Sequence, residues 1–209
     1  MQVDHHDSEI ERQQIPTEAK TTRVTTAYDK GTSTTRTETA KTAVGLGGPS
    51  HEVIDKTEVV GKDGKKHGSE DKTTFKADLG GATRTDSATE SRDDGSSSTR
   101  SRTTGVERGK GKLGTVDIRT SGETDAAGTS QTTTTTTRKG LTAGPDGVCA
   151  YADREKKFEN KRANGFSTGA VAGLSGNIKC NVVAKGGEPP KFQVSISIDL
   201  GMRAGLSAG

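Results

Sequence analysis

The most regular alternation of apolar and polar positions lies near the end of the chain, over residues 192–206. Every second residue there is apolar: Phe192, Val194, Ile196, Ile198, Leu200, Met202, Ala204 and Leu206. A period of two predicts a β-strand. Strands usually have about 3–10 residues, so this one is either very long or bent. Gly201 and Gly205 are the positions where a bend or bulge would cost least.

A second pattern of this kind precedes it and predicts a hairpin. Asn164-Gly165 is typical of a two-residue type I′ turn. If Ala163 pairs with Phe166, counting outwards places Cys149 directly opposite Cys180. Opposed residues in an antiparallel ladder lie about 4.5–5.5 Å apart at Cα, a separation that a disulfide tolerates. The sequence therefore predicts a Cys149–Cys180 disulfide, which presumes an oxidising compartment.

Residues 153–162 allow a helix as the alternative, because they have good helix propensity and Asn164-Gly165 could also end a helix. The apolar face of such a helix is poor, so we favour a strand. Ser175-Gly176-Asn177 predicts a bulge or a further turn. The KGGEPP segment at 185–190 ends the strand, because proline cannot donate to a ladder. Residues 148–209 are thus expected to form three or four long antiparallel strands with one apolar face.

Residues 17–140 are runs of threonine, serine and charged residues separated by glycine-rich turns about 14 to 18 residues apart. The predicted turns are Lys30-Gly31, Gly47-Gly48, Lys62-Asp63-Gly64, Gly80-Gly81, Asp93-Asp94-Gly95, Gly109-Lys110-Gly111, 124–128 and Lys139-Gly140. This spacing predicts a meander of antiparallel hairpins or the coils of a β-solenoid. Runs such as 131–137 have no apolar face, so a thin extended sheet or disorder is expected here.

The composition excludes a conventional core through the whole length. The hydrophobic fraction is 26%, against about 45–50% in ordinary globular chains. Charged residues make up 28% and favour disorder, whereas scarce proline and abundant threonine favour strands. The net charge of +3 is nearly balanced, which gives no support to nucleic-acid binding. Residues 1–16 are expected to be a disordered polar tail, and they do not resemble a secretory signal peptide.

Gly144-Pro145-Asp146-Gly147 fits a turn, and apolar residues become denser from Val148 onwards. The predicted organisation is therefore an all-β chain with a tail at 1–16, a threonine-rich region at 17–140, a linker at 141–147 and a small antiparallel β module at 148–209.

Motifs that carry chemistry are missing. The sequence has no CxxC, HExxH, GxSxG or phosphate-binding loop. His5-His6-Asp7 lacks the further ligands that a structural metal site needs. Carboxylates are scattered among lysines and arginines, where burial cannot raise a pKa enough for acid–base catalysis. We expect no enzyme, no metal and no cofactor.

Residues 132–137 resemble, locally, the threonine arrays of certain β-solenoid ice-binding proteins. Neighbouring runs carry charges where such a face would need hydroxyls and methyls, and this argues against that function. The charges are Arg36, Glu38, Arg84, Asp86, Arg100 and Arg102. The chain as a whole resembles no family that we recognise.

The apolar row of 192–206 suggests a function, because contiguous exposed apolar patches are rare on soluble monomers. A final strand also tends to lie at a sheet edge, where another chain can pair. We therefore expect a structural or self-assembling protein of a fibre, matrix or surface layer, with a copy of itself as partner and an extracellular location. A central strand that buries the row internally stays open. So do a membrane-active or ligand-binding module of the pore-forming-hairpin kind and a hydrophilic stress-protective chain.

Overall fold

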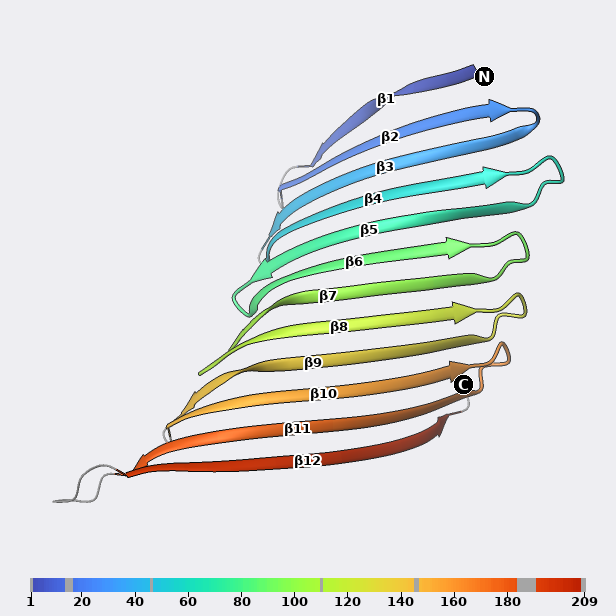
Figure 1. Ribbon diagram of the computed structural model, residues 1–209. Coiled ribbons are helices and arrows are strands. Elements are labelled where there is room, and N and C mark those ends of the chain that lie inside the picture. The colour runs from blue at the N-terminus through green and yellow to red at the C-terminus, as the bar shows by residue number, and fades with distance from the viewer. Residues whose placement is uncertain are drawn as a thin grey trace.

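The computed structural model describes residues 2–13, 17–45, 47–109, 111–144, 147–183 and 191–207. They form one open sheet of 12 antiparallel strands in which neighbours along the chain are neighbours in space (Figure 1). The strands are β1 (Gln2–Gln13), β2 (Thr17–Asp29), β3 (Thr32–Gly45), β4 (Gly48–Val60), β5 (Lys66–Asp78), β6 (Gly81–Ser91), β7 (Ser97–Gly109), β8 (Lys112–Thr124), β9 (Ser130–Gly144), β10 (Gly147–Lys161), β11 (Ser167–Val183) and β12 (Lys191–Ser207). The prediction of an all-β meander is confirmed, and the solenoid alternative is not what forms.

The first strand differs from the sequence prediction. A disordered tail is expected over residues 1–16, but β1 pairs with β2, with a register irregularity between His6 and Glu9. A polar composition indicates that the side chains are not buried, but it does not exclude backbone pairing. Backbone N–H and C=O groups pair whatever side chains they carry, and β1 supplies partners for what would otherwise be an open edge of β2.

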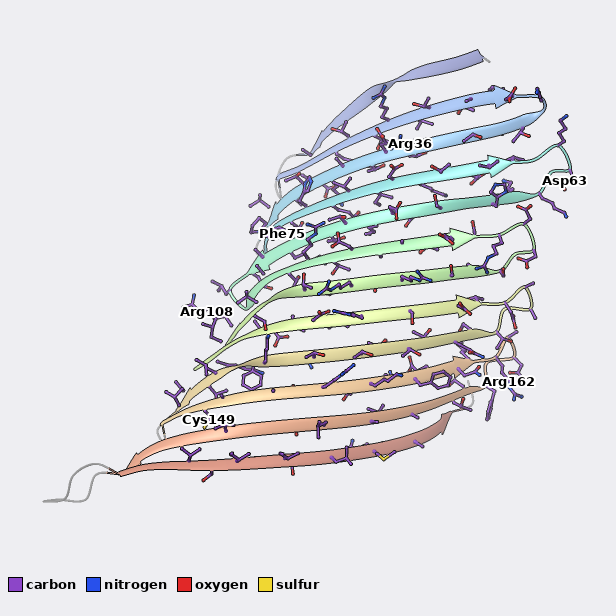
Figure 2. The ribbon with its side chains drawn as sticks, in the orientation of Figure 1. Arg36, Asp63, Phe75, Arg108, Cys149 and Arg162 are labelled. Atoms are coloured by element: carbon purple, nitrogen blue, oxygen red, sulfur yellow. The ribbon has the colours of Figure 1, made fainter. Side chains whose placement is uncertain are left out.

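Four hairpin loops at one end of the sheet share one structure. They cover residues 61–65, 92–96, 125–129 and 162–166, and in each the N–H of the first residue donates to the carbonyl of the fifth. The fourth residue is always a glycine with φ between 77° and 87°, a region that side chains disfavour. Each is a three-residue loop with glycine in the left-handed position. Asp63 and Arg162 mark this end in Figure 2, and Phe75, Arg108 and Cys149 lie toward the other.

In three of these loops the residue before the glycine fixes the turn, and in the fourth, where that residue is Ala127, Asp125 accepts from the N–H of Thr129 at 2.8 Å instead. The side-chain oxygen of Asp63 accepts from the N–H of Lys65 at 3.2 Å, and that of Asp94 accepts from Ser96 at 2.9 Å. Asn164 accepts from the N–H of Phe166 in the same way, at 3.2 Å. Asp and Asn favour turns through this bond to the backbone two residues on.

This loop chemistry overturns the predicted register of the hairpin. Ala163, Asn164 and Gly165 all lie in the loop, so Arg162 bonds to Phe166 where a two-residue turn would pair Ala163 with it. The one extra loop residue moves the whole ladder, and Cys149 pairs with Lys179 while Cys180 pairs with Val148. The prediction that the two cysteines share a rung is therefore wrong.

The disulfide itself stays a prediction, now without the register that motivated it. Cys149 is half-buried and forms no disulfide with any side chain that the structure describes. The side chain of Cys180 lies outside the part that the structure describes. Mass spectrometry of unreduced protein, with and without a thiol-alkylating reagent, tests the bond.

Other local predictions divide clearly. Residues 153–161 are strand, as favoured, within β10. The turn at Lys139-Gly140 is wrong, because β9 continues to Gly144 and β10 starts at Gly147. β9 and β10 pair directly, so residues 141–144 belong to β9, Gly147 belongs to β10, and the sheet runs through the boundary between the two predicted regions. Ser175-Gly176-Asn177 is neither bulge nor turn, since β11 passes through it in register.

The molecule is one layer thick, and side chains project from both sides of it (Figure 2). Among the described side chains only Val116, at 5% exposed, and Ser96, at 8%, are buried. The total accessible surface is 14958 Å², whereas a globular monomer of 21.7 kDa would expose about 9,200 Å². The fold is held by its backbone ladder and by contacts along each face, and much of its surface is left exposed to solvent.

Candidate functional site

The register divides the side chains into two faces, because paired residues point to the same side and successive residues alternate. The rung through Ser101, Thr120 and Thr134 belongs to one side, which we call the threonine face. The rung through Arg102, Arg119 and Thr135 belongs to the other, which we call the mixed face. Each face is a separate candidate for function.

On the mixed face, β12 presents a row of exposed apolar side chains. Their exposed fractions are 59% for Val194, 68% for Ile196, 71% for Ile198, 75% for Leu200 and 78% for Met202. We call these five residues the apolar row.

The adjacent strand widens this surface. Leu174 and Ile178 of β11 pair with Leu200 and Ile196, and both are themselves about half exposed. The sequence prediction that alternate residues of this strand share one face is confirmed for the apolar row. Phe192 and Leu206 occupy the matching rungs opposite Val182 and Thr168, but their side chains lie outside the described part.

The backbone of β12 is open as well. β12 is the last strand in the sheet order, so its outer N–H and C=O groups face none of the strands that the structure describes. Burial of the row in the interior of a central strand is therefore not what forms. The strand has 17 residues and pairs with β11 without a register shift, so Gly201 and Gly205 produce no bulge.

Charges give this edge little protection. Asp199 and Arg203 are the charged residues within 192–206. They pair with Ser175 and Val171, so they point to the threonine face, away from the apolar row. Inward-pointing charges and bulges are the usual means by which edge strands avoid pairing, and the apolar side of β12 has neither.

The threonine face carries a continuous area without charged side chains over β6 to β9. Its hydroxyl groups come from Thr83, Thr85, Ser87, Thr89, Ser91, Ser97, Thr99, Ser101, Thr103, Thr120, Thr124, Ser130, Thr132, Thr134 and Thr136. Hydroxyls on the same rung bond across strands, with O–O distances of 2.8 Å for Thr85 and Thr103 and 3.3 Å for Thr120 and Thr134. Such cross-strand pairs are a usual source of sheet stability.

This area corrects the sequence argument against a regular threonine array. All six charges that seemed to interrupt it lie on the mixed face: Arg36, Glu38, Arg84, Asp86, Arg100 and Arg102. Residues adjacent in a strand point to opposite sides. Neighbours along the chain are therefore not neighbours on a face.

The mixed face of β5 to β9 is instead a field of ion pairs around an open hollow of about 490 Å³. Arg102 and Arg119 both donate to Asp117, at 2.8 and 3.2 Å, and their hydrogen bonds lower the pKa of Asp117 to about 2. Arg84 and the hydroxyl of Thr73 likewise lower the pKa of Asp86. Carboxylates held ionised in this way are poor proton donors near neutral pH.

A packed cluster around Tyr151 was not predicted from the sequence. Tyr151 lies on the threonine face, where a Cβ added to Gly140 or Gly114 would meet its hydroxyl oxygen. The ammonium of Lys112 sits 4.5 Å from the centre of the Tyr151 ring.

An ion pair lies next to the buried side chain of Val116, on the same face as Tyr151. Arg138 of β9 and Glu107 of β7 pair at 3.4 Å across β8, next to Val116. The signal for this cluster in the sequence is glycine within a strand pattern, which marks a close approach; Gly140 was instead assigned to a turn.

Within the described ranges, no three His, Cys, Asp or Glu side chains come close enough to hold a metal ion. No helix in those ranges is long and apolar enough to cross a membrane. The chain matches no protein-family model, no curated protein and no solved structure.

Proposed function

We propose that this protein is a structural, self-assembling β-sheet whose copies associate through β12. The observation that carries the proposal is the apolar row, five side chains 59–78% exposed on an edge strand. Water disfavours a contiguous apolar surface of this kind, and large exposed patches mark interaction sites.

The magnitudes allow stable association. Fully burying one such side chain contributes roughly 1.5–3 kcal/mol. Joining the two edges covers each of the ten side chains on one flank only, so together they would supply on the order of 5–10 kcal/mol. Association itself costs an estimated 4–15 kcal/mol, so the row can meet that cost with the backbone bonds of the edge in addition. The large accessible surface of the single layer supports the same conclusion.

A copy of this chain fits the row better than lipid does. β12 combines an apolar side with unpaired backbone groups, and a second strand can engage both at once, whereas hydrocarbon cannot bond to N–H or C=O. The membrane-active alternative is kept as an outcome of the test.

Ile196→Lys tests the proposal, with Ser197→Lys as the matched control on the threonine face of the same strand. Sedimentation velocity should show assembled wild type, assembled Ser197→Lys and monomeric Ile196→Lys, and circular dichroism should show β structure in all three. A lysine on the apolar side is hydrated in the monomer but unpaired in the contact. Wild-type protein that stays monomeric at high concentration would overturn the proposal, and leakage of phosphatidylcholine vesicles by that monomer would favour the membrane alternative.

The charge-free area of the threonine face over β6 to β9 favours one second function, binding to a surface of regularly spaced hydrogen-bonding groups such as ice. Hydroxyls repeat there about every 4.8 Å across strands and about every 6.8 Å along them. Thr134→Lys should abolish inhibition of ice recrystallisation, and Thr135→Lys, on the mixed face, should retain it. No inhibition by wild-type protein would end this idea.

A further inference from the structure

The open edge of β12 and its two charges indicate how the copies join. We propose that two copies pair antiparallel along β12 about a twofold axis at Gly201, so that their sheets become one continuous sheet. This inference rests on the self-association proposed above and specifies its partner strand and register.

The partner strand is a second β12 because β12 matches its own pattern. The apolar side of one copy continues across the contact only if the facing strand is also apolar at every second position. β1, the strand at the other end of the sheet, reads QVDHHDSEIERQ and has no such row. Pairing of β12 with itself is isologous and closes at two copies.

The geometry restricts the register. Every second residue of an edge strand directs its backbone N–H and C=O groups away from the sheet. In a pair of β12 strands, a residue of this kind must lie opposite a residue of the same kind. Even-numbered residues therefore face even-numbered residues, which also keeps the apolar row of both copies on one side. With a twofold axis between the strands, one residue lies opposite the same residue of the second copy. Each possible register is therefore defined by the residue that lies on the axis.

The charges select one of these registers. Asp199 and Arg203 are both exposed, and neither has an ion-pair partner within the described part of the chain. An axis at Gly201 places Asp199 of each copy opposite Arg203 of the other, twice over. An axis at Asp199 would set two carboxylates against each other, which is unfavourable. Axes at Ile198, Leu200 or Met202 leave both charges opposite uncharged residues.

The remaining rungs fit this register. Leu200 faces Met202 of the second copy, and Ile198 faces Ala204, so the apolar rows interlock on the mixed face. At the axis itself, a Cβ built on Gly201 has no heavy atom within 4 Å. The two ion pairs therefore flank an open position on the threonine face.

A charge-reversal cycle tests the register by sedimentation equilibrium. Asp199→Arg and Arg203→Asp should each replace attraction by repulsion on two rungs and weaken dimerisation roughly 10- to 100-fold. The double variant restores opposite charges and should return to within about threefold of wild type. A double variant as weak as the sum of the single changes would overturn the register, while Ile196→Lys would still report on self-association separately.

Cross-linking gives a second, independent readout in protein with Cys149 and Cys180 replaced by serine. Gly201→Cys should form an interchain disulfide on mild oxidation, because residues facing each other lie about 4.5–5.5 Å apart at Cα. Ser197→Cys, four residues from the axis, should not. Cross-linking at Ser197 in place of Gly201 would contradict the proposed axis, and a monomeric wild type would remove the dimer and the self-association together.

Discussion

The threonine-rich strands β2–β9 and the terminal strands β10–β12 share one backbone ladder but use their side chains differently. In β2–β9 both faces are largely polar, and hydroxyl pairs and ion pairs join neighbouring strands within the chain. In β11 and β12 the mixed face is apolar and exposed. A single layer can satisfy polar side chains by itself, but it leaves apolar ones open to water, so the partner that we propose is expected at the terminal strands.

The largest difference between these regions is expected in protease resistance. The assembly that we propose through β12 would protect the terminal strands, whereas the threonine-rich strands lie away from that edge. Limited trypsin digestion of the assembled protein should cut at the hairpin-loop residues Lys62, Lys65 and Arg92 before it cuts at Arg162, which lies in the corresponding loop of the terminal strands, and mass spectrometry of the fragments gives the order. A resistant fragment covering 17–140, with the terminal strands lost, would reverse the comparison.

The next effect in size concerns the packed cluster that joins the two regions. A Cβ at Gly114 would meet the hydroxyl oxygen of Tyr151 and lie 2.8 Å from the carbonyl oxygen of Lys139. Gly114→Ala should therefore lower the free energy of unfolding by about 1–3 kcal/mol through overpacking.

Gly122→Ala is the matched control on the same strand and face. A Cβ there lies 3.4 Å from the nearest atom, the Thr132 hydroxyl oxygen, and the change should be neutral or slightly stabilising. Urea unfolding of the two variants separates them. Equal stability of the two variants would mean that the hydroxyl of Tyr151 does not pack against Gly114.

The smallest effect belongs to the ion pairs of the threonine-rich strands. Asp117→Asn removes the carboxylate shared by Arg102 and Arg119 and should lower the Tm by about 1–3 °C at pH 7, as expected for exposed pairs. The pKa of Asp117 is lowered to about 2, so its contribution is complete above the unfolded pKa near 4 and disappears as the pH falls to 2. The Tm gap from wild type should close over that interval. Glu123→Gln is the control on the same strand and face, and it should leave the Tm at pH 7 close to that of wild type.

Much of the fold could be predicted because its signals are local. Gly64, Gly95 and Gly165 mark loops by needing positive φ, and alternation alone identified β12. The register could not be predicted, because it depends on the number of residues in the loop. Ala163 lies in the loop and not on a rung, so Cys149 pairs with Lys179 and not with Cys180.

In the candidate site, too, local features could be predicted from the sequence and features that depend on the whole sheet could not. The apolar row was evident from the sequence, but its exposure depends on β12 being at the edge, which is a property of the whole strand order. The charge-free area of the threonine face was missed because Arg100 and Arg102 stand next to its residues in the sequence. Only the pairing of every strand shows that they point away from Ser101 and Thr120.

Amide hydrogen exchange at two protein concentrations tests the central claim most directly. Association through the edge of β12 predicts that outward-facing amides of β12 exchange about tenfold or more slowly at the higher concentration, because they become bonded to a second copy. Amides of β5, which has a strand on either side, should exchange equally at both. Equal exchange of β12 at both concentrations, with new protection in another strand, would contradict the account.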